Sequence, residues 1–164
     1  MLSAKMLALL NDQINHEDFS SYMYLAMAAY FEAESLPGFA TWMRVQAGEE
    51  HEHAMKFFDY VIDRGGRAKL AAIPEPPFEW ASPLDAFEKV LAHEQKVTSL
   101  IHTLYEAAVQ EKDYPTQVML HWFIDEQVEE EKNAQAIVDQ LRMMDDHKGG
   151  LLNLDHHIGK RKGD

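Results

Sequence analysis

Carboxylate, imidazole and amide side chains interrupt the apolar stripes of four long segments of this chain. Glu17, for example, lies three positions after Ile14 and seven before Tyr24. Residues three, four or seven positions apart share one face of a helix, so Glu17 faces inward with its apolar neighbours. A buried carboxylate is costly unless it is paired or binds a metal. The spacing therefore predicts a site inside the protein.

The other three segments carry the same interruption near their middles. Glu50 and His53 stand three positions apart in the second segment, Glu94 stands in the third, and Gln127 and Glu130 stand in the fourth. Since a helix rises only about 1.5 Å per residue, groups near each midpoint share one level of a helical bundle. Six residues, which we call the central cluster, are expected to converge: Glu17, Glu50, His53, Glu94, Gln127 and Glu130.

The donor atoms of the central cluster indicate which cation it suits. Four carboxylates buried together repel one another, and bound cations offset that repulsion. Carboxylate and imidazole donors favour iron or manganese, and the sequence has no cysteine to favour copper(I) or zinc. Ferritin-like di-iron bundles use one glutamate from each of two helices and Glu-x-x-His from each of the others. Here Gln127 and Glu130 replace the second Glu-x-x-His, which predicts an asymmetric pair of metals.

Clusters of glycine and proline mark where the helices end. Helices are expected at about 5–35, 37–64, 83–112 and 114–145, with a short helix near 150–160. Ser82, before Pro83, and Asp113 are suited to cap the third and fourth helices. The connection of residues 65–82 is long enough to cross a bundle, which makes the second and third helices parallel.

These elements predict an all-α fold. It is a ferritin-like four-helix bundle with one long crossover and a short fifth C-terminal helix. We expect a single domain over residues 1–164, with the bundle at about 5–145.

Charge and hydropathy limit the partners. The net charge is −13 with histidine neutral, which disfavours nucleic acid and attracts cations. The longest apolar run, Tyr22 to Phe31, is far shorter than the roughly 20 residues that span a bilayer. The first residues lack the pattern of a signal peptide. We therefore expect a cytoplasmic protein with no membrane or nucleic-acid partner.

Nearly the whole chain resembles the prokaryotic non-haem ferritins. Each matching segment alone is weak evidence for the family, but the segments together are specific for it. They are Trp42-Met43, Glu49-Glu50 with His53 to Phe57, Arg64 to Arg67, Pro76-Pro77, His93-Glu94, Gln110 to Asp113 and Glu126 to Glu131.

The resemblance implies a ferroxidase centre with two irons. Glu17, Glu50 and His53 would hold the first iron, with Glu50 bridging. Glu94 and Glu130 would hold the second.

Four further residues and Gln127 receive roles from the same resemblance. Gln127 lies beside the second iron, either as a ligand or as a hydrogen-bonding group. Glu49, Glu126 and Glu129 match the ligands of a third iron site that shares Glu130. Tyr24 matches a tyrosine beside the centre, although core packing alone also explains it.

The resemblance also implies the reaction and the assembly. Oxygen or peroxide would convert pairs of ferrous ions to ferric ions, which are stored as a hydrated oxide. Members of the family form hollow homo-oligomeric shells of twenty-four subunits, and the tail helix helps to close the shell.

Other classes of protein share parts of this pattern. Bacterioferritin has a second Glu-x-x-His and a haem-binding methionine where His51 stands here, so we expect no haem. Rubrerythrin-like peroxidases need a cysteine-ligated iron, which the composition excludes, and mini-ferritins place iron between subunits. A di-iron oxidase would need a substrate pocket at the metals. A metal-free structural bundle would have to tolerate the buried carboxylates.

Overall fold

Helix is the only regular secondary structure in the described part of the chain. The computed structural model describes residues 1–144 and 147–163, so the predicted helix end at 145 lies outside the described residues, as do 146 and 164. The helices are α1 (Ala4–Ala33), α2 (Pro37–Asp63), α3 (Pro83–Gln110), α4 (Tyr114–Met144) and α5 (Lys148–Ile158). The all-α prediction is confirmed. None of these helices combines the length and the apolar character needed to cross a membrane.

Polar side chains cap the helices where the sequence indicated. The Ser82 hydroxyl accepts a hydrogen bond from the backbone N–H of Asp85 at 3.1 Å, and Pro83 occupies the first turn of α3. Asp113 accepts from the backbone N–H of Thr116 at 3.3 Å at the start of α4. These caps satisfy N–H groups that have no partner within the helix, so they fix where α3 and α4 begin.

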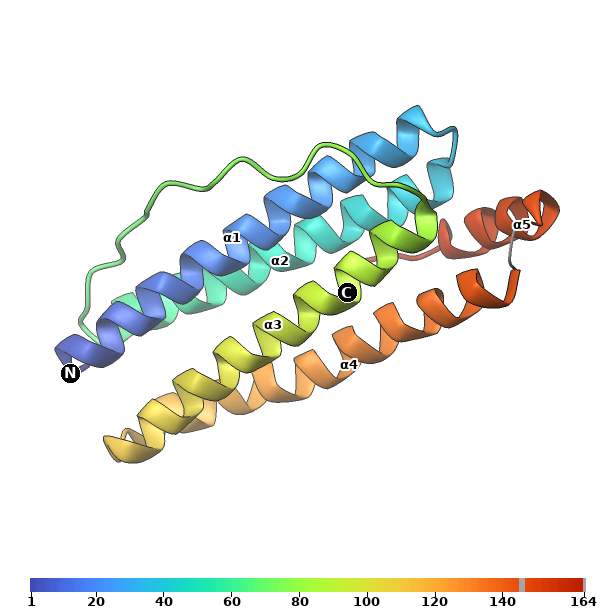
Figure 1. Cartoon of the computed structure of the whole chain (residues 1–164). Coiled ribbons are helices and arrows are strands. Elements are labelled where there is room, and N and C mark those ends of the chain that lie inside the picture. Colours follow the sequence, from blue (N-terminus) through green and yellow to red (C-terminus); the bar gives the residue numbers. More distant parts are fainter. Residues whose placement is uncertain (145–146, 164) are drawn as a thin grey trace.

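A long crossover between α2 and α3 sets the topology. Figure 1 shows it running past α1, from the end of α2 to the opposite end of the bundle, so that α2 and α3 are parallel as predicted. Near one end of α1, Asn11 accepts a hydrogen bond from the backbone N–H of Lys69 at 2.8 Å. Near the other end, the ring of Trp80 packs 5.4 Å from that of Tyr30. The crossover is therefore held along most of α1.

The apolar core is divided into two clusters. One contains stacked Phe57 and Phe123, whose ring centroids are 4.0 Å apart, and the other contains stacked Phe31 and Phe39. In each of the four long helices, one half contributes to the first cluster and the other half to the second. The central cluster falls between the two halves in every helix, so it is sealed on both sides by apolar packing.

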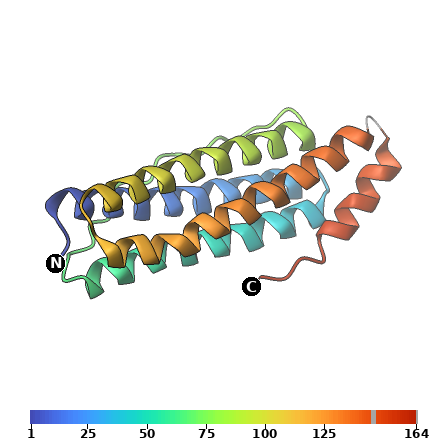
Figure 2. The same cartoon turned by 90° about the horizontal axis from the view of Figure 1, so that it is seen from below.

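Helix α5 docks on the start of α2. Leu36 provides no side-chain cap there, and the carboxylate of Asp155 in α5 accepts the backbone N–H of Phe39 at 2.8 Å instead. A carboxylate is favourable at a helix N-terminus. A side chain at Gly38 would place its Cβ 1.7 Å from the carbonyl oxygen of Asp155, so only glycine allows this approach. Figure 2 shows the tail after α5 turning back along the bundle.

Replacing Gly38 with alanine should displace α5. The added methyl group collides with backbone, and overpacking of this kind costs about 1–3 kcal/mol. Hydrogen exchange by mass spectrometry should show loss of protection in residues 148–158 and retained protection in α1 to α4. Gly48→Ala is the matched control, because a Cβ at Gly48 meets nothing within 4 Å. Unchanged protection of α5 in Gly38→Ala would contradict this account of the docking.

Candidate metal centre

The six residues of the central cluster converge in the middle of the bundle. Each exposes 5% of its surface or less, and all four long helices contribute. Polar side chains this deep in a core need partners or a cation. The convergence expected from spacing is therefore present in the structure: Glu17, Glu50, His53, Glu94, Gln127 and Glu130.

Glu17, Glu50 and His53 form the first half of the cluster. One potential ligand atom from each lies within 4.8 Å of the others. An amide holds one oxygen of each carboxylate: Gln13 donates to Glu17 Oε1 at 2.7 Å, and Gln46 donates to Glu50 Oε1 at 2.9 Å. The amides thereby orient both carboxylates. Both glutamines stand four positions before their glutamates, and this spacing in a helix indicates such a side-chain pair.

Glu94 anchors the other half of the cluster. The Tyr24 hydroxyl donates a hydrogen bond to Glu94 Oε1. The Gln127 amide nitrogen donates to Glu94 Oε2 at 3.1 Å and to the Glu94 carbonyl at 3.2 Å. Both Tyr24 and Gln127 therefore position this carboxylate. Ligation of iron by the amide oxygen of Gln127 stays a prediction.

The four residues assigned to a third site are not all brought together. Glu126, Glu130 and His53 offer ligand atoms within 4.8 Å of one another, and His53 Nε2 lies 3.9 Å from Glu126 Oε1. The side chain of Glu126 is 23% exposed, so this group faces the surface more than the first half does. Glu129 is exposed on α4 and belongs to neither group.

Glu49, the remaining third-site residue, pairs with Arg161 from the C-terminal tail. Arg161 also donates to Gln46 Oε1 at 2.7 Å and lies over the Trp42 ring, 4.6 Å from its centroid. No spacing in the sequence predicts this contact, because Arg161 stands 112 positions from Glu49 and follows the last helix.

Burial and mutual repulsion determine where protons reside in the cluster. Burial raises the pKa of Glu17 well above its usual value, and the charge of Glu50 adds to the shift. The pKa of Glu94 is raised in the same way, by burial and then by Glu50 and Glu130. Burial is also the largest single influence on Glu50 and acts to raise its pKa. The hydrogen bond and charge of His53, together with the hydrogen bond from Gln46, outweigh burial and lower the pKa of Glu50.

Glu130 changes its protonation state close to neutral pH. Burial, followed by the charge of Glu50, raises the pKa of Glu130 from 4.5 to about 7. The central cluster thus retains protons that a cation would replace, since metal ligands must be deprotonated. Oxygen and imidazole donors without a thiolate fit a hard or borderline divalent ion such as ferrous iron.

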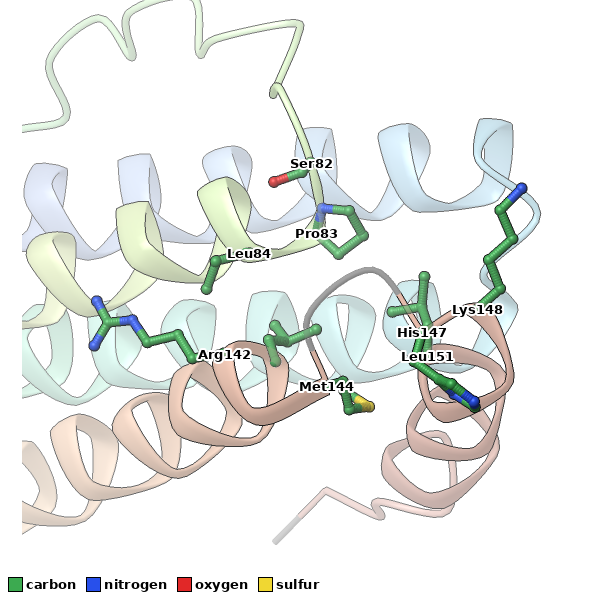
Figure 3. Close-up of a pocket in the computed structure, with 9 residues that line it drawn as sticks. Ser82, Pro83, Leu84, Arg142, Met144, His147, Lys148 and Leu151 are labelled. Carbon is green, nitrogen blue, oxygen red and sulfur yellow. The ribbon is translucent and has the colours of Figure 1, made fainter.

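The cavity in Figure 3, of about 530 Å³, lies away from the central cluster. It sits between the start of α3, the end of α4 and the start of α5, and is lined by residues such as Leu84, Arg142 and Leu151. None of the described residues that line it belongs to the central cluster. This cavity is therefore separate from the candidate metal centre.

Comparisons with known proteins agree with the fold. The family model described as ferritin-like domain matches residues 7–144. The chain is 44% identical to a bacterial non-heme ferritin of Bacteroides fragilis, over 98% of this chain and 100% of the relative. It is 42% identical to one from Staphylococcus aureus, over 100% of this chain and 99% of the relative.

Solved structures give the same result. An open pore ferritin from the archaeon Archaeoglobus fulgidus superposes with a TM-score of 0.98 at 53% identity, covering 99% of this chain and 100% of that one. A four-helix bundle with carboxylates and an imidazole buried at one level defines a ferritin-like protein. The chain belongs to the ferritin family.

A bound cation should stabilise this protein more at high pH than at low pH. The proton on Glu130 stabilises the metal-free fold below about pH 4.5, and this contribution is lost as the pH rises through about 7. Zn²⁺ should therefore raise Tm more at about pH 8 than at about pH 6, as measured by calorimetry.

Glu130→Gln provides the control for this pH dependence. It removes the titrating group, so the difference between the two pH values should shrink. Equal stabilisation of the unsubstituted protein at both pH values would contradict the assignment of Glu130 to the cation site.

Proposed function

We propose that this chain is an iron-storing ferritin subunit with a ferroxidase centre at the central cluster. The observation that carries the proposal is the burial of four carboxylates and one imidazole at a single level between two apolar clusters. Relatives named bacterial non-heme ferritin match the full length of the chain and support it. Glu17, Glu50 and His53 bind the first ferrous ion, and Glu94 and Glu130 bind the second.

The chemistry is the transfer of one electron from each ferrous ion to an oxidant. Dioxygen accepts the two electrons with two protons and becomes hydrogen peroxide, or hydrogen peroxide accepts them with two protons and becomes two water molecules. Two ferric ions result in either case. Carboxylate ligands favour this direction, because negative charge stabilises a trivalent ion more than a divalent one. The amides of Gln13 and Gln46 keep two of the carboxylates oriented, and the Tyr24 hydroxyl and Gln127 keep Glu94 in place.

We further propose that the ferric product is stored inside a homo-oligomeric cage of twenty-four subunits, the assembly implied by the resemblance to prokaryotic non-haem ferritins. The solved structures similar to this chain are described as ferritins, one of them as open pore. Apolar side chains exposed on α1 and the crossover suit contact between subunits, among them Tyr22 at 49%, Leu70 at 68% and Phe78 at 82%. Large exposed apolar patches are typical of surfaces that bind another protein.

Further parts of the proposal are a single-domain organisation over residues 1–164, a third iron site with Glu49, Glu126 and Glu129, and a cytoplasmic location. The partial exposure of Glu126 beside His53 supports a route for iron between solvent and the centre.

Ligand variants test the ferroxidase centre. Glu50→Ala and His53→Ala should each slow the first oxidation of ferrous iron at least tenfold, because each removes a donor from the first metal position. The rate is followed by ferric absorbance after oxygen is added to protein loaded anaerobically.

Two neighbours on α2 serve as matched controls, since His51 and Glu52 are exposed. His51→Ala and Glu52→Ala should oxidise iron within about twofold of the unsubstituted rate. Oxidation at the full rate in Glu50→Ala or His53→Ala would refute the ligand assignment. The particle mass, measured in parallel, separates a storage cage that retains many irons from a small oxidase that stops at the bound pair.

A further inference from the structure

Arg161 is held at the edge of the metal centre by three contacts from α2. Its guanidinium donates to Gln46 Oε1 at 2.7 Å and forms an ion pair with Glu49. It also lies over the ring of Trp42, 4.6 Å from the centroid. The Arg161 side chain is only 20% exposed. Three directional contacts and this burial indicate a defined position and not a surface arginine that pairs by chance.

Gln46 connects Arg161 to the central cluster through hydrogen bonds. Gln46 accepts from Arg161 through its oxygen and donates through its nitrogen to Glu50 Oε1 at 2.9 Å. The guanidinium is thus one amide away from a carboxylate of the first metal position. Arg161 also adds a fixed positive charge beside Glu49, since an arginine stays protonated at any physiological pH.

We propose that Arg161 is a tethered cation that occupies Glu49, so that a cation binding at Glu49, Glu126 and Glu130 must first displace it. The proposal rests on the proposed function, because it takes Glu49 as a ligand of the third cation together with Glu126 and Glu130. The guanidinium of Arg161 already pairs with Glu49 Oε2, and its positive charge repels an arriving cation. The third cation therefore binds more weakly than the first two.

The fold allows such a displacement without undocking a helix. Helix α5 is anchored separately, through Asp155 at the start of α2, so only the few residues after it have to move. Figure 2 shows this tail as an irregular segment beneath the bundle. Release of Arg161 also frees the oxygen of Gln46, the residue that orients Glu50. Occupancy of the third position and the geometry of the first are thereby coupled, and such coupling is reciprocal.

Equilibrium binding of Zn²⁺ to the metal-free cage, measured by calorimetry, tests the competition without any oxidation. In Arg161→Gln the third equivalent per chain should bind roughly tenfold more tightly than in the unsubstituted protein, a change typical of coupling between two ligands. The first two equivalents should change by less than about threefold. Arg161→Lys keeps the charge and loses the two-pronged contact, so its effect should be intermediate.

Two controls separate competition at Glu49 from a general change in charge. Lys162→Gln removes the same charge from the exposed neighbouring position and should leave all three affinities unchanged. In a Glu49→Gln background, adding Arg161→Gln should give no further gain, because the shared carboxylate is gone. A third equivalent that binds no more tightly in Arg161→Gln, or a gain that persists without Glu49, would overturn the proposal.

Fluorescence reports the displacement itself. With Trp80 and Trp122 replaced by phenylalanine, Trp42 is the only tryptophan left, and Arg161 lies on its ring. Its emission should change with the third equivalent of Zn²⁺ and not in Arg161→Gln. Unchanged Trp42 emission in the single-tryptophan protein that retains Arg161 would refute displacement. Failure of the unsubstituted protein to bind even the first two equivalents would instead refute the proposed function, and this inference with it.

Discussion

The cost of burying several carboxylates in one place governs this structure. Glu17, Glu50, Glu94 and Glu130 lie together in the interior of a helical bundle, and each is at most 4% exposed. The raised pKa values of Glu17, Glu94 and Glu130 express that cost in a protein without a bound ion. A pair of divalent cations at the proposed centre would remove that cost, so the same repulsion would provide the driving force for binding metal.

The rest of the fold keeps this arrangement in place. Two apolar clusters seal the carboxylates from both ends, and the crossover along α1 allows all four long helices to contribute to one level. Amides at Gln13, Gln46 and Gln127 orient the carboxylates through hydrogen bonds. Apolar packing at the two ends of the bundle thus stabilises the fold, and the central cluster between them carries the polar groups of the site.

Helical periodicity explains why so much of the site could be predicted from the sequence. Glu50 and His53 are three positions apart on a long amphipathic helix, so their shared inward face follows from geometry alone. The surroundings of Glu49 and Glu129 could not be predicted in this way. A residue next to a buried stripe of a helix can point toward the core or toward solvent. Arg161 and Asp155 could not be predicted, since their contacts depend on how α5 returns to α2. Only the three-dimensional packing contains that information.

Anomalous diffraction would show whether iron binds at the central cluster. Crystals loaded anaerobically with ferrous iron would be measured above and below the iron absorption edge. Two peaks are expected within the bundle, one beside Glu17, Glu50 and His53 and one beside Glu94 and Glu130. Peaks found only on the protein surface, with the central cluster empty, would show that the buried carboxylates are stabilised by some means other than a pair of metal ions.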